Sequence, residues 1–301
     1  MTPPDSPHPS IDDEWHEPLL IQVRHLTRFV YQGPTTDSFN EARLQPVSNH
    51  AQECLKFDLR IDPLTAVRDY PDFFGNCVHY FDVTPVHQSL EVEAVSLVQT
   101  RADIIDSLPS ENPPSGLKDS AIVENYFDFL QDSAFVSLEA EIWREALDVL
   151  PGGLTDLWRD SVTIGRHIFK NFIYTPSFTT VNTKLLEVLA TRRGVCQDFA
   201  HLMLGMCRSM QIPARYVSGY FLNPLRREDE IEASHAWVEV YLPGYGWKGF
   251  DPTHNRVPDT RYVKLAVGRD YGDIRPVSGT FRGHGTREMT VEVQVRRGEL
   301  S

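Results

Sequence analysis

The first hundred residues carry short runs in which apolar and polar side chains alternate, a pattern typical of strands with one buried face. These runs lie at 20–23, 55–61, 78–83 and 90–98. Turn-forming clusters such as the one at 32–34 separate them, and no helical period lies between them. We therefore predict an antiparallel sandwich or barrel-like β module over residues 19–106.

A different period begins after a Pro- and Ser-rich break at 107–117, which we interpret as a linker between domains. Apolar residues three and four positions apart then predict helices at 121–130, 137–150, 155–172 and 195–210. Strands follow the last helix, at 214–221, 236–242 and 247–250. This mixture predicts an α+β core over residues 118–267.

Composition and charge exclude several classes of protein. The 301 residues are 41% hydrophobic, which is enough for a packed core, and 42 acidic against 29 basic side chains leave a net charge of −13. Nucleic acids and anionic lipids both require a concentrated basic face, and no run approaches the roughly 18 apolar residues of a membrane span. We expect neither a nucleic-acid partner nor a membrane partner.

Residues 1–18 are rich in proline and acids and contain no Lys or Arg, so we expect a disordered acidic tail rather than an export signal. The chain has only four cysteines, which without an export signal is typical of a reducing compartment. No two Cys or His have the close spacing of a structural zinc site, and no calcium-loop motif occurs. The expectation is a cytoplasmic protein without disulfides, metal or cofactor.

The segment RGVCQDF at 193–199 is the most informative one for chemistry. Its cysteine, Cys196, comes two residues after Gly194 and lies at the start of the helix predicted at 195–210. Free backbone N–H groups and the positive end of the helix dipole stabilise a thiolate at such a position. The same N–H groups can donate to the oxyanion of a tetrahedral intermediate. Cys196 is thus a candidate nucleophile, which needs a base and a residue that orients the base.

His235 and Asp251 can supply both functions if their segments form a hairpin. With Gly244 at the centre of the turn, His235 faces about residue 253, and Asp251 is its diagonal neighbour on the same face. Diagonal side chains across two strands reach one another, whereas a shift of one residue would separate them. In this arrangement Asp251 orients the imidazole through one ring nitrogen, and the other ring nitrogen pairs with Cys196.

The chain ends in a strand at 289–295, where valines alternate with polar residues. One face of this strand needs an apolar partner, and the module at 19–106 offers sheet edges. We therefore expect residues 268–301 to return and pack beside that module. The module would then form one wall of the cleft near Cys196.

Two blocks, GVCQDFAHLMLGMCRSMQIPARYVSGY and SHAWVEVYLPGYGWKGFDPTHN, resemble the transglutaminase-like cysteine enzyme superfamily in its bacterial branch. Residues 25–46 and 69–81 are similar to the N-terminal β module of that branch, and 268–285 to the segment after its core. The resemblance implies a papain-like α+β architecture with the nucleophile at a helix N-terminus. It puts the family's catalytic triad on Cys196, His235 and Asp251.

Other side chains in these regions have simpler interpretations. Asp198 lies in the first helical turn, where a carboxylate caps free N–H groups. Tyr174 could line the cleft or help an oxyanion hole, but core packing is the preferred interpretation. The remaining cysteines are expected in the core: Cys54, Cys77 and Cys207.

Two more histidines lie near the motifs. His201 is fixed on the same helix as Cys196, and His254 lies close to the turn beyond the aspartate. We therefore expect neither of them to replace His235 as the base.

These inferences predict a cysteine-dependent enzyme that acts on peptide or protein amides through an acyl-thioester on Cys196. We favour peptide or isopeptide hydrolysis over amine transfer to a protein glutamine, because bacterial-branch members are mostly regarded as peptidase-like. Water or an amine must reach the acyl-enzyme, and that depends on the shape of the cleft. A second hypothesis is a non-catalytic member of the fold that binds a peptide or protein.

Overall fold

The computed structural model describes residues 17–101, 111–180, 183–224, 234–283 and 286–299. The strands in these ranges are β1 (Leu19–Ala42), β2 (Gln52–Asp62), β3 (Val67–Pro71), β4 (Cys77–Val83), β5 (His87–Thr100), β6 (Ile173–Tyr174), β7 (Arg193–Gly194), β8 (Ala214–Phe221), β9 (His235–Leu242), β10 (Gly246–Phe250), β11 (Tyr262–Gly268), β12 (Val277–Gly283) and β13 (Arg287–Arg297). The α-helices are α1 (Ser120–Asn125), α2 (Ala140–Val149), α3 (Leu157–Asn171), α4 (Leu185–Thr191) and α5 (Cys196–Ser209). Short 3-10 helices are η2 (Pro114–Lys118) and η3 (Phe127–Phe129).

The predicted acidic tail at 1–18 lies almost wholly outside the described residues. Of the predicted linker at 107–117, residues 111–117 are described, and the short helix η2 begins there at Pro114. The domain boundaries therefore stay predictions. No helix in the described part of the chain is long and apolar enough to cross a membrane.

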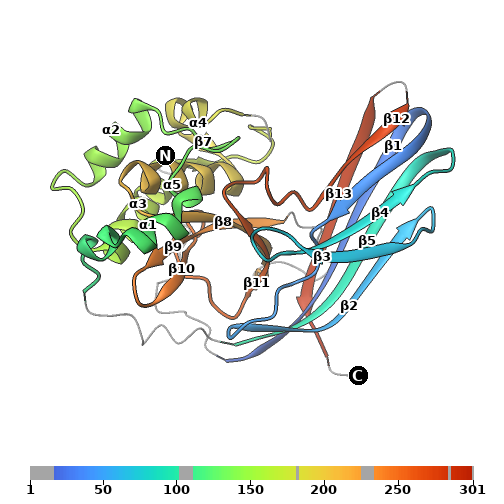
Figure 1. Cartoon of the computed structure of the whole chain (residues 1–301), viewed down its shortest axis with the longest axis horizontal. Coiled ribbons are helices and arrows are strands. Elements are labelled where there is room, and N and C mark those ends of the chain that lie inside the picture. Colours follow the sequence, from blue (N-terminus) through green and yellow to red (C-terminus); the bar gives the residue numbers. More distant parts are fainter. Residues whose placement is uncertain (1–16, 102–110, 181–182, 225–233, 284–285, 300–301) are drawn as a thin grey trace, which may run out of the picture.

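The long strand β1 organises the larger sheet, whose order is β2-β5-β1-β4-β3 with β12 and β13 also paired to β1 (Figure 1). The first half of β1 lies between β5 and β13, and the second half pairs with β4 and β12. The turn predicted at 32–34 is wrong, because the strand continues through it. A register shift between Val30 and Thr35 accommodates Pro34, which has no N–H to donate to a ladder.

The smaller sheet is antiparallel and has the order β10-β9-β8-β11. In its hairpin Leu242 pairs with Gly246, and Val238 pairs with Phe250. The turn is centred on Gly244, whose φ of 81° favours glycine. The predicted hairpin register is confirmed.

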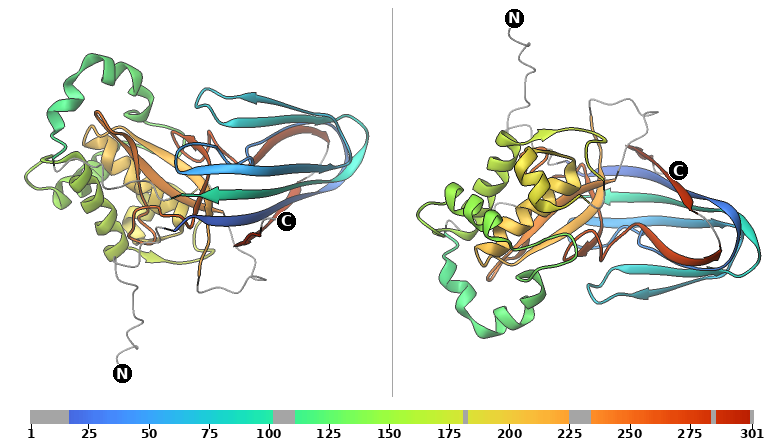
Figure 2. Two further views of the ribbon diagram at one scale, coloured as in Figure 1. Left: turned by 90° about the horizontal axis from the view of Figure 1, so that it is seen from below. Right: turned by 90° about the horizontal axis from the view of Figure 1, so that it is seen from above.

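The helices gather at one end of the molecule and the long strands of the larger sheet at the other, with β8–β11 between them (Figures 1 and 2). Helix α5 is buried almost all round, from Phe199 to Arg208, which marks it as the central helix. The helix predicted at 121–130 is shorter than expected, since α1 ends at Asn125 and η3 follows it. The sequence patterns did not identify α4, β11 or β12.

One hydrophobic core joins the two ends of the chain to the helical part. Ile21 of β1 and Val293 of β13 belong to the same buried cluster as Leu202 and Met206 of α5. A second cluster, which includes Phe29 and Phe81, fills the larger sheet away from the helices. The N-terminal strands are thereby packed directly against the part of the chain that carries Cys196.

Candidate active site

Helix α5 begins at Cys196, and the residue before it, Val195, has extended backbone angles. The carboxylate of Asp198 accepts hydrogen bonds from the Val195 N–H at 2.8 Å and from the Thr179 hydroxyl at 2.5 Å. A Cβ atom on Gly194 would lie 2.8 Å from Asp198, so a glycine is needed for this approach. Asp198 therefore fixes the backbone at the start of α5, which is the structural role that the sequence indicated.

His235 is the first residue of β9, and Asp251 directly follows β10. The Nε2 atom of His235 lies 2.7 Å from Oδ2 of Asp251. Asp251 is fully buried and His235 is 8% exposed. The hairpin register thus brings together the two residues that the sequence placed as diagonal neighbours.

The buried pair is strongly polarised. Burial disfavours the charged form of both groups, but in each case the charge of the partner and the hydrogen bond between them prevail. Asp251, with a further contribution from Cys196, raises the pKa of His235 to about 10. His235 and His254 hold the pKa of Asp251 well below its usual range. At neutral pH the pair is an imidazolium beside a carboxylate.

Cys196 is the second residue that interacts with the His235 side chain. A hydrogen bond between their side chains is one of the interactions that raise the pKa of His235. Because Nε2 is occupied by Asp251, the ring nitrogen left for the thiol is Nδ1. The Sγ atom of Cys196 also lies 3.9 Å from the backbone oxygen of Ser234. Cys196 is half-buried, so part of this residue is open to solvent.

Two further side chains hydrogen-bond to Asp251, and neither contact was predicted from the sequence. The Nδ1 atom of His254 and the hydroxyl of Tyr262 each lie 2.7 Å from Oδ2 of Asp251. The other carboxylate oxygen accepts the backbone N–H groups of Thr253 and His254 at 2.7 and 3.2 Å. The short spacing Asp-x-x-His could have indicated His254, whereas no local signal indicates Tyr262 on β11.

The same cluster contains a possible metal site. One ligand atom each from His235, Asp251 and His254 lies within 4.8 Å of the others. These residue types suit Zn²⁺, but the atoms involved already hydrogen-bond to one another. Spacing along the sequence does not indicate this group, because it forms only when β9 and β10 pair.

His201 is a core residue on α5. Burial lowers its pKa to about 3, and its Nε2 atom accepts the Tyr271 N–H at 3.2 Å. Its ring stacks on Phe135 at a centroid distance of 5.6 Å. A neutral, enclosed imidazole of this kind is held in a packing role.

Three of the core predictions are wrong. Tyr174 is 49% exposed because it lies in the short outer strand β6. Cys54 and Cys77 are half-buried, since β2 lies at the edge of the larger sheet and Cys77 is the first residue of β4. Cys207 is fully buried, as predicted.

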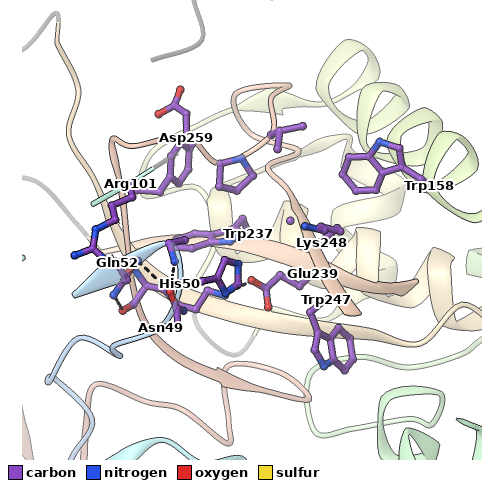
Figure 3. Close-up of a pocket in the computed structure, with 16 residues that line it drawn as sticks. Asn49, His50, Gln52, Arg101, Trp158, Trp237, Glu239, Trp247, Lys248 and Asp259 are labelled. Atoms are coloured by element: carbon purple, nitrogen blue, oxygen red, sulfur yellow. Dashed lines mark hydrogen bonds and ion pairs between the residues drawn. The ribbon is translucent and has the colours of Figure 1, made fainter. Parts of the chain in front are cut away.

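A separate pocket of about 90 Å³ lies where the N-terminal strands meet β9 and β10 (Figure 3). Its lining includes Asn49, His50, Gln52, Trp237, Glu239 and Lys248. The Trp237 ring lies beside the His235 ring, with centroids 6.1 Å apart. Although burial opposes it, Lys264 and Arg215 lower the pKa of Glu239 to about 2. None of the three triad candidates lines this pocket, but Trp237, which does line it, packs beside the His235 ring.

Comparisons with known proteins agree with this fold. Residues 151–252 match the transglutaminase-like superfamily, and residues 21–99 match the bacterial transglutaminase-like N-terminal region. A proposed cysteine protease from Cytophaga hutchinsonii has a similar solved structure, with a TM-score of 0.71 and 22% identity. That similarity covers 95% of this chain and 92% of the other, and it shows the fold.

Several curated bacterial proteins are similar in sequence. The uncharacterized protein ML0607 of Mycobacterium leprae is 34% identical over 281 residues, which is 92% of this chain and 98% of that protein. A protein-glutamine gamma-glutamyltransferase of Pseudomonas aeruginosa is 39% identical over 74 residues, or 23% of this chain and 11% of that protein. The predicted α+β fold and the predicted family are confirmed. The chain belongs to the transglutaminase-like superfamily, a family of cysteine-dependent enzymes.

Proposed function

We propose that the protein acts on amide bonds of a peptide or protein through an acyl-thioester on Cys196. The observation that supports this most is the line of contacts from Cys196 through His235 to the buried carboxylate of Asp251. A cysteine, an imidazole and an acceptor in this order are the components of a nucleophilic catalytic triad.

In the first step, the protonated His235 stabilises the Cys196 thiolate, which attacks the carbonyl carbon of the amide. A C–S bond forms and the carbonyl oxygen becomes an oxyanion. Backbone N–H groups at the start of α5 are the donors best placed to stabilise that charge. Asp251 keeps the imidazole in one tautomer and orientation throughout.

The intermediate then collapses. The C–N bond breaks, and His235 gives its proton to the leaving amine. In the second half of the reaction a water molecule attacks the thioester and gives a proton to His235. The C–S bond then breaks, a carboxylic acid leaves and the thiolate returns.

Hydrolysis is favoured because members of the bacterial branch that these motifs resemble are mostly regarded as peptidase-like. The alternative is transfer of the acyl group to an amine, and it rests on the short match to the gamma-glutamyltransferase. Both reactions share every step up to the acyl-enzyme. We propose a cytoplasmic location and no metal requirement, although His235, Asp251 and His254 could bind a metal ion.

The test is to assay purified protein for cleavage of a peptide library and for incorporation of a labelled amine into a glutamine substrate. We expect cleavage that disappears in Cys196→Ala and persists in Cys54→Ala, which removes another half-buried thiol. Incorporation without cleavage would favour the transferase. Neither activity in the wild type would favour a binding protein. Loss of activity with a chelator would contradict a metal-free mechanism.

A further inference from the structure

The apolar inner face of β13 is buried only in the second half of the strand. Val295 and Val293 are 7% and 0% exposed, whereas Val291 and Met289 on the same face are 40% and 53% exposed. Alternate residues of a strand share one face, so the exposed pair continues the buried row. Apolar side chains that line a concave site are typical of ligand-binding pockets.

These two side chains form part of the wall of a pocket of about 170 Å³. The remaining lining residues come from β1, from residues 271–277 and from the residue before β9: His25, Thr27, Tyr271, Pro276, Val277 and Ser234. Thr27 lies directly opposite Val291 in the β1–β13 ladder. An apolar cavity of about 150 Å³ holds a benzene molecule, so this pocket is large enough for a phenylalanine side chain.

The described residues offer no charge to an occupant of this pocket. Within the part of the chain that the structure describes, the lining includes no Asp, Glu, Lys or Arg. Burial lowers the pKa of His25 to about 4, so this ring is neutral at neutral pH. Both of its nitrogens are engaged, Nδ1 with the Tyr220 hydroxyl at 2.9 Å and Nε2 with the Thr27 hydroxyl at 3.1 Å. A charged side chain would therefore lose its hydration here without gaining a partner.

The pocket lies beside the proposed nucleophile. Ser234 lines it, and the backbone oxygen of Ser234 is 3.9 Å from Sγ of Cys196. A substrate whose amide carbon reaches Cys196 therefore has a neighbouring residue at the pocket. The exposed positions of Met289 and Val291 leave the pocket accessible from solvent.

We propose that this pocket is a substrate subsite for an uncharged apolar side chain, aromatic or large aliphatic, that flanks the amide attacked by Cys196. Its role in catalysis rests on the proposed function, whereas its affinity for apolar side chains does not. The N-terminal strand β1 and the C-terminal strand β13 then determine specificity for a nucleophile located on α5.

A binding measurement tests the pocket without any turnover. The sequence has five methionines, so ¹³C-methyl labelling gives a simple spectrum. The Met289 signal is assigned with Met289→Leu, and the fully buried Met203 is the internal control. We expect N-acetyl-phenylalanine amide at millimolar concentration to shift the Met289 signal saturably, and N-acetyl-aspartic acid amide to leave it unchanged. No saturable shift with the phenylalanine amide would overturn the proposal.

A selectivity measurement tests the catalytic part. Peptides varied around the scissile amide are compared for wild type, Met289→Lys and the control Val30→Lys, at an exposed position on the opposite face of β1. We expect at least about a tenfold preference for Phe over Asp at one position. We expect this preference to fall about tenfold in Met289→Lys and to persist in Val30→Lys.

An unchanged preference in an active Met289→Lys variant would overturn the subsite while leaving the proposed function intact. If no amide is turned over by the wild type, the proposed function fails instead. The methyl titration then decides the affinity of the pocket by itself.

Discussion

Tyr262 donates its hydroxyl to Oδ2 of Asp251 over 2.7 Å, and the same oxygen faces Nε2 of His235 at the same distance. His254 is a third donor to this oxygen. Asp251 has no exposed surface, so these donors offset the cost of removing its charge from water. We assign Tyr262 a positioning role, because it acts on the carboxylate that orients the imidazole.

Replacing Tyr262 by phenylalanine should lower kcat about tenfold, the effect of losing one hydrogen bond to a charged group. Asp251 would be less firmly held, so the alkaline limb of the pH–rate profile should also move to lower pH. Tyr245→Phe is the matched control, since Tyr245 is an exposed turn residue. A Tyr262→Phe enzyme with wild-type kcat and an unchanged pH profile would remove Tyr262 from the account.

Asp251→Asn keeps the size of the side chain and removes its charge. We expect kcat to fall by about 10³–10⁴, because the imidazole loses both its orientation and its stabilised charge. The pKa of His235 should also fall, since Asp251 is the main group that raises it. NMR titration of the imidazole measures this directly, and an unchanged His235 titration in the variant would contradict the assignment.

The ion pair between His235 and Asp251 should also make the folding stability depend on pH. The folded pKa of about 10 lies above the ordinary value of 6.5, so the contribution is complete below pH 6.5 and is lost as the pH rises toward 10. The free energy of unfolding of wild type relative to His235→Gln should therefore decrease over that range in urea titrations. The contribution of Asp251 has the opposite sense and is lost in acid, because its folded pKa is lowered. If the difference in unfolding free energy between wild type and His235→Gln stays constant from pH 6.5 to 10, this prediction is contradicted.

The C-terminal strand should contribute to the stability of the whole chain. Val293→Ala removes a fully buried side chain and should cost roughly 2–3 kcal/mol of unfolding free energy. Val291→Ala, at a position that is 40% exposed, should cost less than about 0.5 kcal/mol. Deleting residues 286–301 should lower Tm by about 10 °C or more, because it removes the whole β1–β13 ladder. A truncated protein that keeps the original Tm and full activity would show that β13 is dispensable.

The parts of the site that could be predicted from sequence are those that local rules control. Cys196 at a helix start, and His235 opposite residue 253, follow from a helical period and from a turn centred on Gly244. Asp198 follows from its position in the first helical turn. Each of these inferences spans only a few residues or one hairpin.

The missed features depend on contacts between distant segments. Tyr262 meets Asp251 only because β11 joins β8 at the edge of the smaller sheet. The turn predicted at 32–34 was wrong because pairing with β5 on one side and β12 on the other keeps β1 extended beyond it. Tyr174 was assigned to the core although its residue type alone does not show that β6 lies on the surface.

The central claim is that Cys196 is an activated nucleophile, and the rate of its alkylation by iodoacetamide tests it most directly. The other cysteines are internal comparisons, since burial raises the pKa of Cys54, Cys77 and Cys207. Peptide mass mapping across pH 5–8 should show Cys196 alkylated faster than a model thiol, with the excess lost in His235→Gln. If Cys196 reacts no faster than the model thiol at pH 6, the account is contradicted.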